Sequence, residues 1–134
     1  MSAFFDTNIL IYAQQEGIKP EAARKVMSLG GTVSIQVLNE FAAVCRRKMR
    51  HGWTEIEEAI EDVLALVARP VPLTIETHRA ALALARDHNL SFYDALIVAS
   101  ALEASCDTLY SEDLQNGRAI GGLTIRNPFI ETAP

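Results

Sequence analysis

The stretch AFFDTNIL, residues 3–10, decides the fold, because it leads from a strand through a carboxylate into a helix. Its first part, Ala3 to Phe5, is short, apolar and aromatic, which is typical of a buried strand. The strand ends at Asp6, and residues 8–15 have the pattern of a short helix closed by Gly17. A carboxylate that directly follows two phenylalanines is expected to be partly buried, where an unpaired charge is costly. Asp6 is therefore the first candidate functional residue.

The same order of strand and helix recurs along the chain. Pro20 suits the first turn of a helix, β-branched residues alternate at 32–35, and Thr54 begins a capping box before an amphipathic run. Strands that alternate with helices pair in parallel through right-handed crossovers. The sequence therefore predicts an α/β fold with a central, mostly parallel sheet of four to five strands and helices on both faces. We expect strands at residues 3–5, 32–35, 73–75, 107–111 and 123–125, and helices at residues 8–15, 20–29, 36–51, 54–67, 76–88 and 95–104.

Length and composition point to one ordinary globular domain over residues 1–134. Of the 134 residues, 49% are hydrophobic and 22% charged, close to the average for folded proteins. Cys45 and Cys106 have no CxxC or histidine pattern around them, so we interpret both as buried free thiols. No signal peptide can be drawn before Asp6, and the longest apolar stretch, residues 95–102, is shorter than the roughly 20 residues that span a bilayer. We therefore expect a cytoplasmic protein with no membrane partner.

Three acidic residues from distant parts of the chain are predicted to meet at one edge of the sheet. Ligands of open α/β sheets bind beyond the carboxyl ends of the strands. Asp6 ends the first predicted strand, Glu40 lies just inside the helix after the second, and Asp113 follows the fourth. Asp94 lies in the first turn of a helix, where an acid is commonly a cap or a partner of the helix dipole. That structural interpretation stays open for Asp94, and also for Glu40 and Asp113.

Four carboxylates brought close together would repel each other, and one would take up a proton unless cations neutralised them. Oxygen ligands without histidine or thiolate pairs favour Mg²⁺ or Mn²⁺ over zinc. Two such ions, roughly 3.5–4 Å apart, support hydrolysis of a phosphodiester bond. The net charge of −5 does not exclude a nucleic-acid substrate, because 17 acidic residues less these four leave 13 against 12 basic ones. Hydrolysis of a nucleic acid is therefore the predicted reaction.

Four motifs, in order, carry a family resemblance. They are FDTNIL at residues 5–10, NE at 39–40, SFYDALI at 91–97 and SEDLQNG at 111–117. Together they resemble the PIN-domain ribonucleases, and their order and spacing are similar to those of VapC-like toxins of bacterial and archaeal toxin–antitoxin pairs. The resemblance covers essentially the whole chain and implies a PIN-like three-layer fold.

The resemblance implies a metal-dependent endoribonuclease in which Asp6, Glu40, Asp94 and Asp113 hold Mg²⁺ or Mn²⁺. It also implies a homodimer, and silencing by a small antitoxin that inserts into the active-site groove. Glu112 beside Asp113 leaves open which carboxylate faces the metal, and Asp113 is the one that matches the motif. By the same matching, the residues that would orient the acids or contact phosphate are Thr7, Asn8 and Ser111.

Arg47 is the best candidate for contact with RNA, because it lies seven residues after Glu40 and hence on the same helix face. Arg47 belongs to a basic cluster that also holds Arg46, Lys48, Arg50 and His51, and the alternative for this cluster is a solvated helix end that suits the helix dipole. Tyr93 could stack on a base, although packing is the commoner role. A haloacid-dehalogenase-type phosphatase would need an acid where this chain has Asn8. The rival from another class is a catalytically silent PIN-like module that binds RNA or protein.

Overall fold

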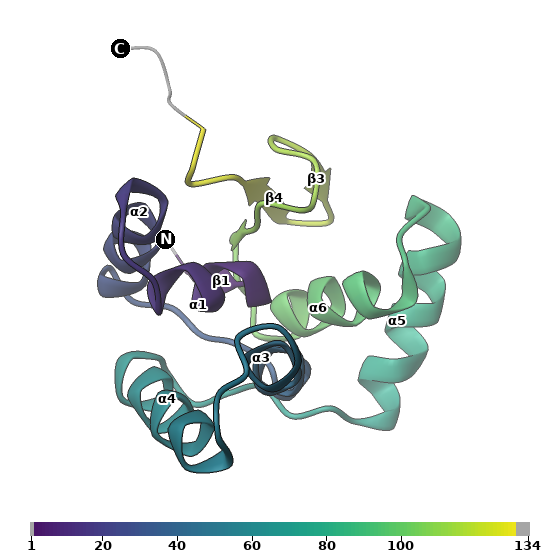
Figure 1. Cartoon of the computed structure of the whole chain (residues 1–134). Helices are drawn as coiled ribbons and strands as arrows, with labels where there is room; N and C mark the ends of the chain where they lie inside the picture. Colours follow the sequence, from purple (N-terminus) through teal and green to yellow (C-terminus); the bar gives the residue numbers. More distant parts are fainter. Residues whose placement is uncertain (1, 131–134) are drawn as a thin grey trace.

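The computed structural model describes residues 2–130, in which one strand is followed by six successive helices and then by three strands (Figure 1). The strict alternation of strands and helices that the sequence predicts is therefore wrong, because the segments at 32–35 and 73–75 form no regular strand. The predicted domain span, residues 1–134, reaches outside the described residues at residue 1 and at residues 131–134. The strands are β1 (Ala3–Phe5), β2 (Thr108–Tyr110), β3 (Ala119–Ile120) and β4 (Leu123–Arg126); the helices are α1 (Thr7–Ala13), α2 (Ile18–Ser28), α3 (Ile35–Arg47), α4 (Trp53–Leu66), α5 (Ile75–His88) and α6 (Phe92–Glu103).

The sheet has the strand order β1-β2-β4-β3 and is mostly parallel. The β1 strand pairs in parallel with β2, with Ala3 opposite Thr108, and β2 pairs in parallel with β4. Only β3 runs antiparallel, against β4. The α/β prediction with a mostly parallel sheet is therefore confirmed, and the carboxyl ends of β1 and β2 lie side by side at one edge.

Two predicted strands, at residues 32–35 and 73–75, are wrong, because polar residues within them cap helices instead. In the segment 32–35, Thr32 forms only an isolated bridge to Phe4, and the Ser34 hydroxyl accepts a hydrogen bond from the N–H of Val37 at 3.1 Å to begin α3. In the segment 73–75, Thr74 caps α5, so Ile75 is helical. The short antiparallel β3 was not predicted, since two residues carry no alternating pattern.

The helices lie around the sheet on both faces, with α1 and α2 on one side of the molecule and α5 and α6 on the other (Figure 1). Helix α3 contacts both α1 and α6. Helix α6 is buried from Ala95 to Ala101, as its apolar sequence predicts. The core also holds Phe4, Phe5 and Phe41, which are fully buried. Within the described residues, no helix is both long and apolar enough to cross a bilayer.

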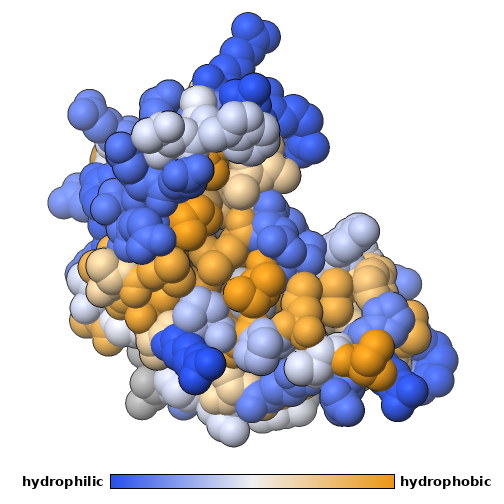
Figure 2. All heavy atoms as spheres, turned by 90° about the horizontal axis from the view of Figure 1, so that it is seen from below, coloured by the Kyte–Doolittle hydropathy of each residue, from blue (hydrophilic) through white to orange (hydrophobic). Residues whose placement is uncertain are grey.

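Apolar side chains gather across the face that is seen from below in Figure 2. Large apolar side chains stay exposed on α4, on α5 and between them, among them Leu66, Leu73, Ile75 and Leu82. A groove of about 650 Å³ lies at the same junction, where the chain passes from α4 to α5 through Pro70 and Pro72. Large apolar surfaces of this kind are typical of interaction sites.

Candidate functional site

Asp6 lies at the carboxyl end of β1 and is 3% exposed. Its position is fixed by its backbone, because its N–H donates to the carbonyl of Tyr110 on the neighbouring β2 at 3.0 Å. Its carboxylate accepts two hydrogen bonds of 2.7 Å, one from the N–H of Thr7 and one from the hydroxyl of Ser111. The sequence prediction that Asp6 is buried at a strand end is confirmed.

The environment of Asp6 disfavours its negative charge. Burial raises the pKa of the Asp6 carboxyl from its usual 3.8 to about 6, although the hydrogen bonds from Ser111 and Thr7 lower it. The negative charges of Asp94 and Asp113 raise the pKa of Asp6 further. The charges of these two acids, one from α6 and one from the segment after β2, therefore both act on the Asp6 carboxylate.

Asn8 connects Asp6 to Asp113. Its side-chain N–H₂ donates to Asp113 at 3.0 Å and makes a longer contact of 3.4 Å with Asp6. Its side-chain oxygen accepts from the backbone N–H of Glu112 at 3.1 Å. Asn8 lies in the first turn of α1, two residues after Asp6, so a single helix start carries both the buried acid and the residue that holds the segment after β2.

Glu40 lies on α3 and is held from both sides. One carboxylate oxygen accepts from the hydroxyl of Thr7 at 3.1 Å, and the other accepts from the amide of Gln36 at 3.1 Å. Thr7 thus links Glu40 to Asp6, since the same residue donates its N–H to Asp6. Gln36 was not singled out from the sequence, although its position four residues before Glu40 places both on one helix face.

Asp94 does not cap its helix. The cap of α6 is Ser91, whose hydroxyl accepts from the backbone N–H of Asp94 at 3.3 Å. The carboxylate of Asp94 makes no hydrogen bond with the rest of residues 2–130 and is half-buried. The N-cap role that the sequence left open for Asp94 therefore belongs to Ser91, whereas favourable interaction with the helix dipole remains available to it.

None of the four acids has a cationic partner within the described part of the chain, where the two ion pairs are Lys19–Glu112 and Arg86–Asp87. The donor set of four carboxylates with amide and hydroxyl support fits a hard cation such as Mg²⁺ or Mn²⁺. No three Asp, Glu, His or Cys side chains of residues 2–130 are arranged closely enough to hold an ion by themselves. The metal-ligand roles of the four acids stay a prediction.

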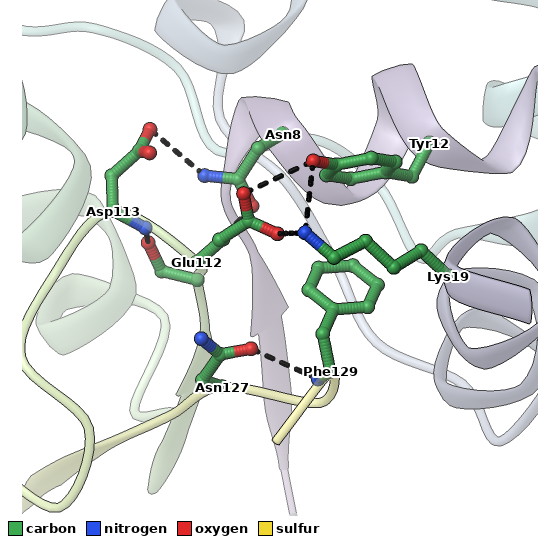
Figure 3. A network of polar contacts seen from close by, with 8 residues as sticks. Asn8, Tyr12, Lys19, Glu112, Asp113, Asn127 and Phe129 are labelled. Atoms are coloured by element: carbon green, nitrogen blue, oxygen red, sulfur yellow. Dashed lines mark hydrogen bonds and ion pairs between the residues drawn. The ribbon is translucent and has the colours of Figure 1, made fainter.

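The neighbouring carboxylates of Glu112 and Asp113 point to different partners (Figure 3). Asp113 is directed to Asn8, whereas Glu112 accepts from the hydroxyl of Tyr12 and from the ammonium of Lys19, both at 3.0 Å. This arrangement favours Asp113 over Glu112 as the acid of the site. Sequence reasoning did not find Tyr12 or Lys19. Tyr12 lies four residues after Asn8 on one helix face, but nothing local in the sequence indicates Lys19.

A groove of about 640 Å³ runs along α3 beside Glu40. Glu40, Arg47 and Tyr93 line it together with Gln36 and Asn39, so the predicted placement of Arg47 on the face of Glu40 is confirmed. Tyr93 is 62% exposed. Its ring contacts that of Phe92 edge-on, with centres 5.7 Å apart, and most of the side chain is left open to solvent.

Arg46, the neighbour of Arg47 in the basic cluster, has different contacts. The Arg46 guanidinium lies 4.5 Å from the ring centre of Trp53 and donates to the carbonyl of His51 at 3.1 Å. Arg46 thus stabilises the turn between α3 and α4. Of these two arginines, Arg47 is the one that lines the groove beside Glu40.

Comparison with known proteins gives one family and several similar structures. A family model described as the PIN domain matches residues 3–119. No curated protein matches the sequence. A toxin–antitoxin complex from Klebsiella pneumoniae is similar with a TM-score of 0.73 and 20% identity, over 96% of this chain and 98% of that one.

Two further solved structures are similar at comparable levels. One is VapC20 from Mycobacterium tuberculosis, described as a toxin that cleaves the sarcin–ricin loop, with a TM-score of 0.68 and 20% identity over 84% of this chain and 90% of that one. The other is VapBC2 from Rickettsia felis bound to a promoter DNA fragment, with a TM-score of 0.68 and 17% identity over 95% and 98%. At these identities the likeness establishes a shared fold.

Proposed function

This chain belongs to the PIN-domain family, and from that premise we propose that residues 1–134 form one PIN-like domain that is a Mg²⁺- or Mn²⁺-dependent endoribonuclease. The observation that carries the proposal is the polar network around Asp6. Asn8 joins Asp6 to Asp113, Thr7 joins it to Glu40, and the Asp94 charge acts on the same carboxylate. The network thus connects acids from the end of β1, from α3 and from the segment after β2, and none of them has a cationic partner within residues 2–130.

Each residue of this network has a role in the proposed site. Ser111 and the N–H of Thr7 fix the Asp6 carboxylate, and Gln36 with Thr7 fixes Glu40. Asp94 and Asp113 complete the set of acids. When bound, Mg²⁺ or Mn²⁺ would supply Lewis-acid chemistry, activating a water and stabilising the departing oxygen of a phosphodiester. A bound cation would also offset the burial, and the smaller repulsion from Asp94 and Asp113, that raise the pKa of Asp6.

The groove beside Glu40 supports a single-stranded RNA substrate. Arg47 can contact a phosphate, and the exposed ring of Tyr93 offers a surface on which an unpaired base can stack. Both line the same groove as Glu40, so a bound strand would pass directly by the acids. VapC20, whose structure is similar to that of this chain, is described as a toxin that cleaves the sarcin–ricin loop, and this is consistent with an RNA substrate.

We further propose that the chain is the toxin of a type II toxin–antitoxin pair, that it acts in the cytoplasm, and that it forms a homodimer. The similar structures include a toxin–antitoxin complex and a VapBC assembly, which supports an antitoxin partner. The large apolar side chains exposed on α4, on α5 and between them support the homodimer, because exposed apolar patches commonly mark an interface.

The test of the proposed reaction is cleavage of RNA by the purified chain. Ribosomal RNA, transfer RNA and single-stranded oligonucleotides are incubated with Mn²⁺, with Mg²⁺ or with EDTA. The matched variants are Asp94→Asn and Asp62→Asn, the second on the exposed face of α4 away from the site. We expect cleavage with either metal and none with EDTA.

Asp94→Asn should reduce the rate by about 100-fold or more, since each ~1.4 kcal/mol of lost transition-state stabilisation is tenfold. Thermal melting controls for the fold, and Asp62→Asn should cleave like wild type. Cleavage by Asp94→Asn at the wild-type rate would contradict the four-acid site. Wild-type protein that binds these RNAs without cutting any of them would support the silent binding module instead.

A further inference from the structure

Glu112 lies between Ser111 and Asp113, two residues of the proposed site, but its side chain points away from that site (Figure 3). Both of its carboxylate oxygens are bound, one by the Tyr12 hydroxyl and one by the Lys19 ammonium, each at 3.0 Å. Glu112 is partly buried, with a side-chain exposure of 28%. The Glu112 carboxylate is thus held by two donors on the side away from Asp113.

Lys19 is itself held in place by more than one contact. Its ammonium lies 3.4 Å from the Tyr12 hydroxyl and 5.2 Å and 5.6 Å from the ring centres of Tyr12 and Phe129. The two rings contact each other, with centres 4.8 Å apart. Phe129 is fixed in turn by Asn127, whose side-chain oxygen accepts the N–H of Phe129 at 2.9 Å. Lys19 therefore joins the start of α2 to α1, to the segment after β2 and to the segment after β4.

The backbone of the same segment carries the site. The Glu112 N–H donates to Asn8 at 3.1 Å, and the Asp113 N–H donates to the Ser111 hydroxyl at 3.2 Å. The Ser111 hydroxyl in turn donates a hydrogen bond of 2.7 Å to the Asp6 carboxylate. Any rotation of the segment that released Glu112 would move these N–H groups, and the Asp113 carboxylate would move with them.

We propose that Lys19 is a positioning residue, which binds the Glu112 carboxylate on the outer side of the segment and so keeps Asp113 directed to Asn8 and Asp6. This inference rests on the proposed function, because it explains how one acid of that site is held. Residues that orient metal ligands without touching the metal typically affect metal affinity or activity by 10- to 100-fold when they are removed. Exposed ion pairs contribute little to stability, so the effect of Lys19 is expected in the site and not in the fold.

The experiment compares wild type with Lys19→Met, Glu112→Gln and Lys19→Arg. The control is Arg86→Met, which removes the other ion pair of the described residues, an exposed pair on α5. The first readout is amide hydrogen exchange at the N–H groups of Glu112 and Asp113. It needs neither metal nor RNA, so it reports on the segment even if the proposed function fails.

We expect roughly tenfold faster exchange at these two N–H groups in Lys19→Met and Glu112→Gln, with wild-type exchange in Lys19→Arg and in the control. The second readout is the Mn²⁺ concentration that half-saturates the protein, followed by the electron paramagnetic resonance of free Mn²⁺. It should rise roughly tenfold in the same two variants and recover in Lys19→Arg. Melting temperatures should stay close to wild type.

Two results would overturn the proposal. Unchanged exchange in Lys19→Met would mean that the segment after β2 does not need Lys19. Faster exchange with unchanged Mn²⁺ affinity would mean that the position of this segment does not matter to the site. In cleavage assays, a lower kcat with an unchanged KM for RNA is expected. A higher KM with an unchanged kcat would instead make Lys19 a direct RNA contact and would refute a positioning role. Wild type with protected amides but no cleavage would refute the proposed function alone.

Discussion

Replacement of Asp6 by asparagine should stabilise the metal-free protein at neutral pH while abolishing RNA cleavage. The rise in the pKa of Asp6 from 3.8 to about 6 reflects the cost of burying its charge. One pKa unit corresponds to about 1.36 kcal/mol, so the ionised carboxylate destabilises the fold by about 3 kcal/mol. Asparagine removes this cost but loses the hydrogen bond from Ser111, worth about 1 kcal/mol. The net gain in unfolding free energy is about 2 kcal/mol.

The sign of the effect depends on pH. Between about 4 and 6 the folded wild type keeps a proton on Asp6 that the unfolded chain has lost, so wild-type stability falls as pH rises through this window. Asp6→Asn has no proton to lose at this position. It should therefore be slightly less stable than wild type below about pH 4 and more stable above about pH 6.

Urea unfolding in EDTA, measured at intervals from about pH 4 to pH 8, gives both free energies. Asp62→Asn, an exposed substitution of the same type, should follow wild type throughout. Addition of Mn²⁺ should then stabilise wild type more than Asp6→Asn, because only a bound ion adds to folding free energy. A stability difference between wild type and Asp6→Asn that stays constant across this pH range would refute the reasoning from burial.

Three further predictions follow from the site, the packing and the surface. Wild type should bind Mn²⁺ only weakly in calorimetric titration without RNA, since Mg²⁺-type sites are completed by substrate phosphate, and equal binding by Asp6→Asn would remove Asp6 from the site. Gly31→Ala should cost about 1–3 kcal/mol in chemical denaturation, because its Cβ would lie 2.7 Å from the Phe5 ring, whereas Gly122→Ala, with no atom within 4 Å, should be neutral. Sedimentation at micromolar concentration should give a homodimer, and a clean monomer of 14.7 kDa would contradict it.

The parts of the fold that follow from local chemistry were predictable from the sequence. Pro20 in the first turn of α2 and Asn89 in the left-handed conformation after α5 are examples, because each acts through its own backbone preference. Ser34 and Thr74 show the limit. Ser34 lies in an alternating, β-branched segment and Thr74 is itself β-branched, so each is compatible with a strand. Serine and threonine are also preferred helix caps, and in the packed structure both residues cap helices.

The residues of the candidate site also divide into those that the sequence predicts and those that only the packed structure shows. Asp6 could be found from the strand that precedes it, and Asp113 from the motif after β2. The bridging role of Asn8 depends on contacts across 105 residues of sequence, and that of Lys19 on contacts across 93. No local pattern encodes such separations. The sequence indicates which acids are candidates, but the residues that orient them emerge only when distant segments are packed together.

The segment at residues 31–35 forms only isolated bridges in place of the predicted strand, and this affects how copies of the protein can meet. The segment 31–35 pairs with β1 through Thr32 on one side and with Val71 on the other, where Pro70 and Pro72 offer no N–H groups. At the opposite margin, β3 spans only Ala119 and Ile120. Each margin of the sheet therefore presents too few free donors to template a further strand, which protects the protein against aggregation by edge-to-edge pairing. Self-association has to proceed through side-chain surfaces and leaves the sheet unextended.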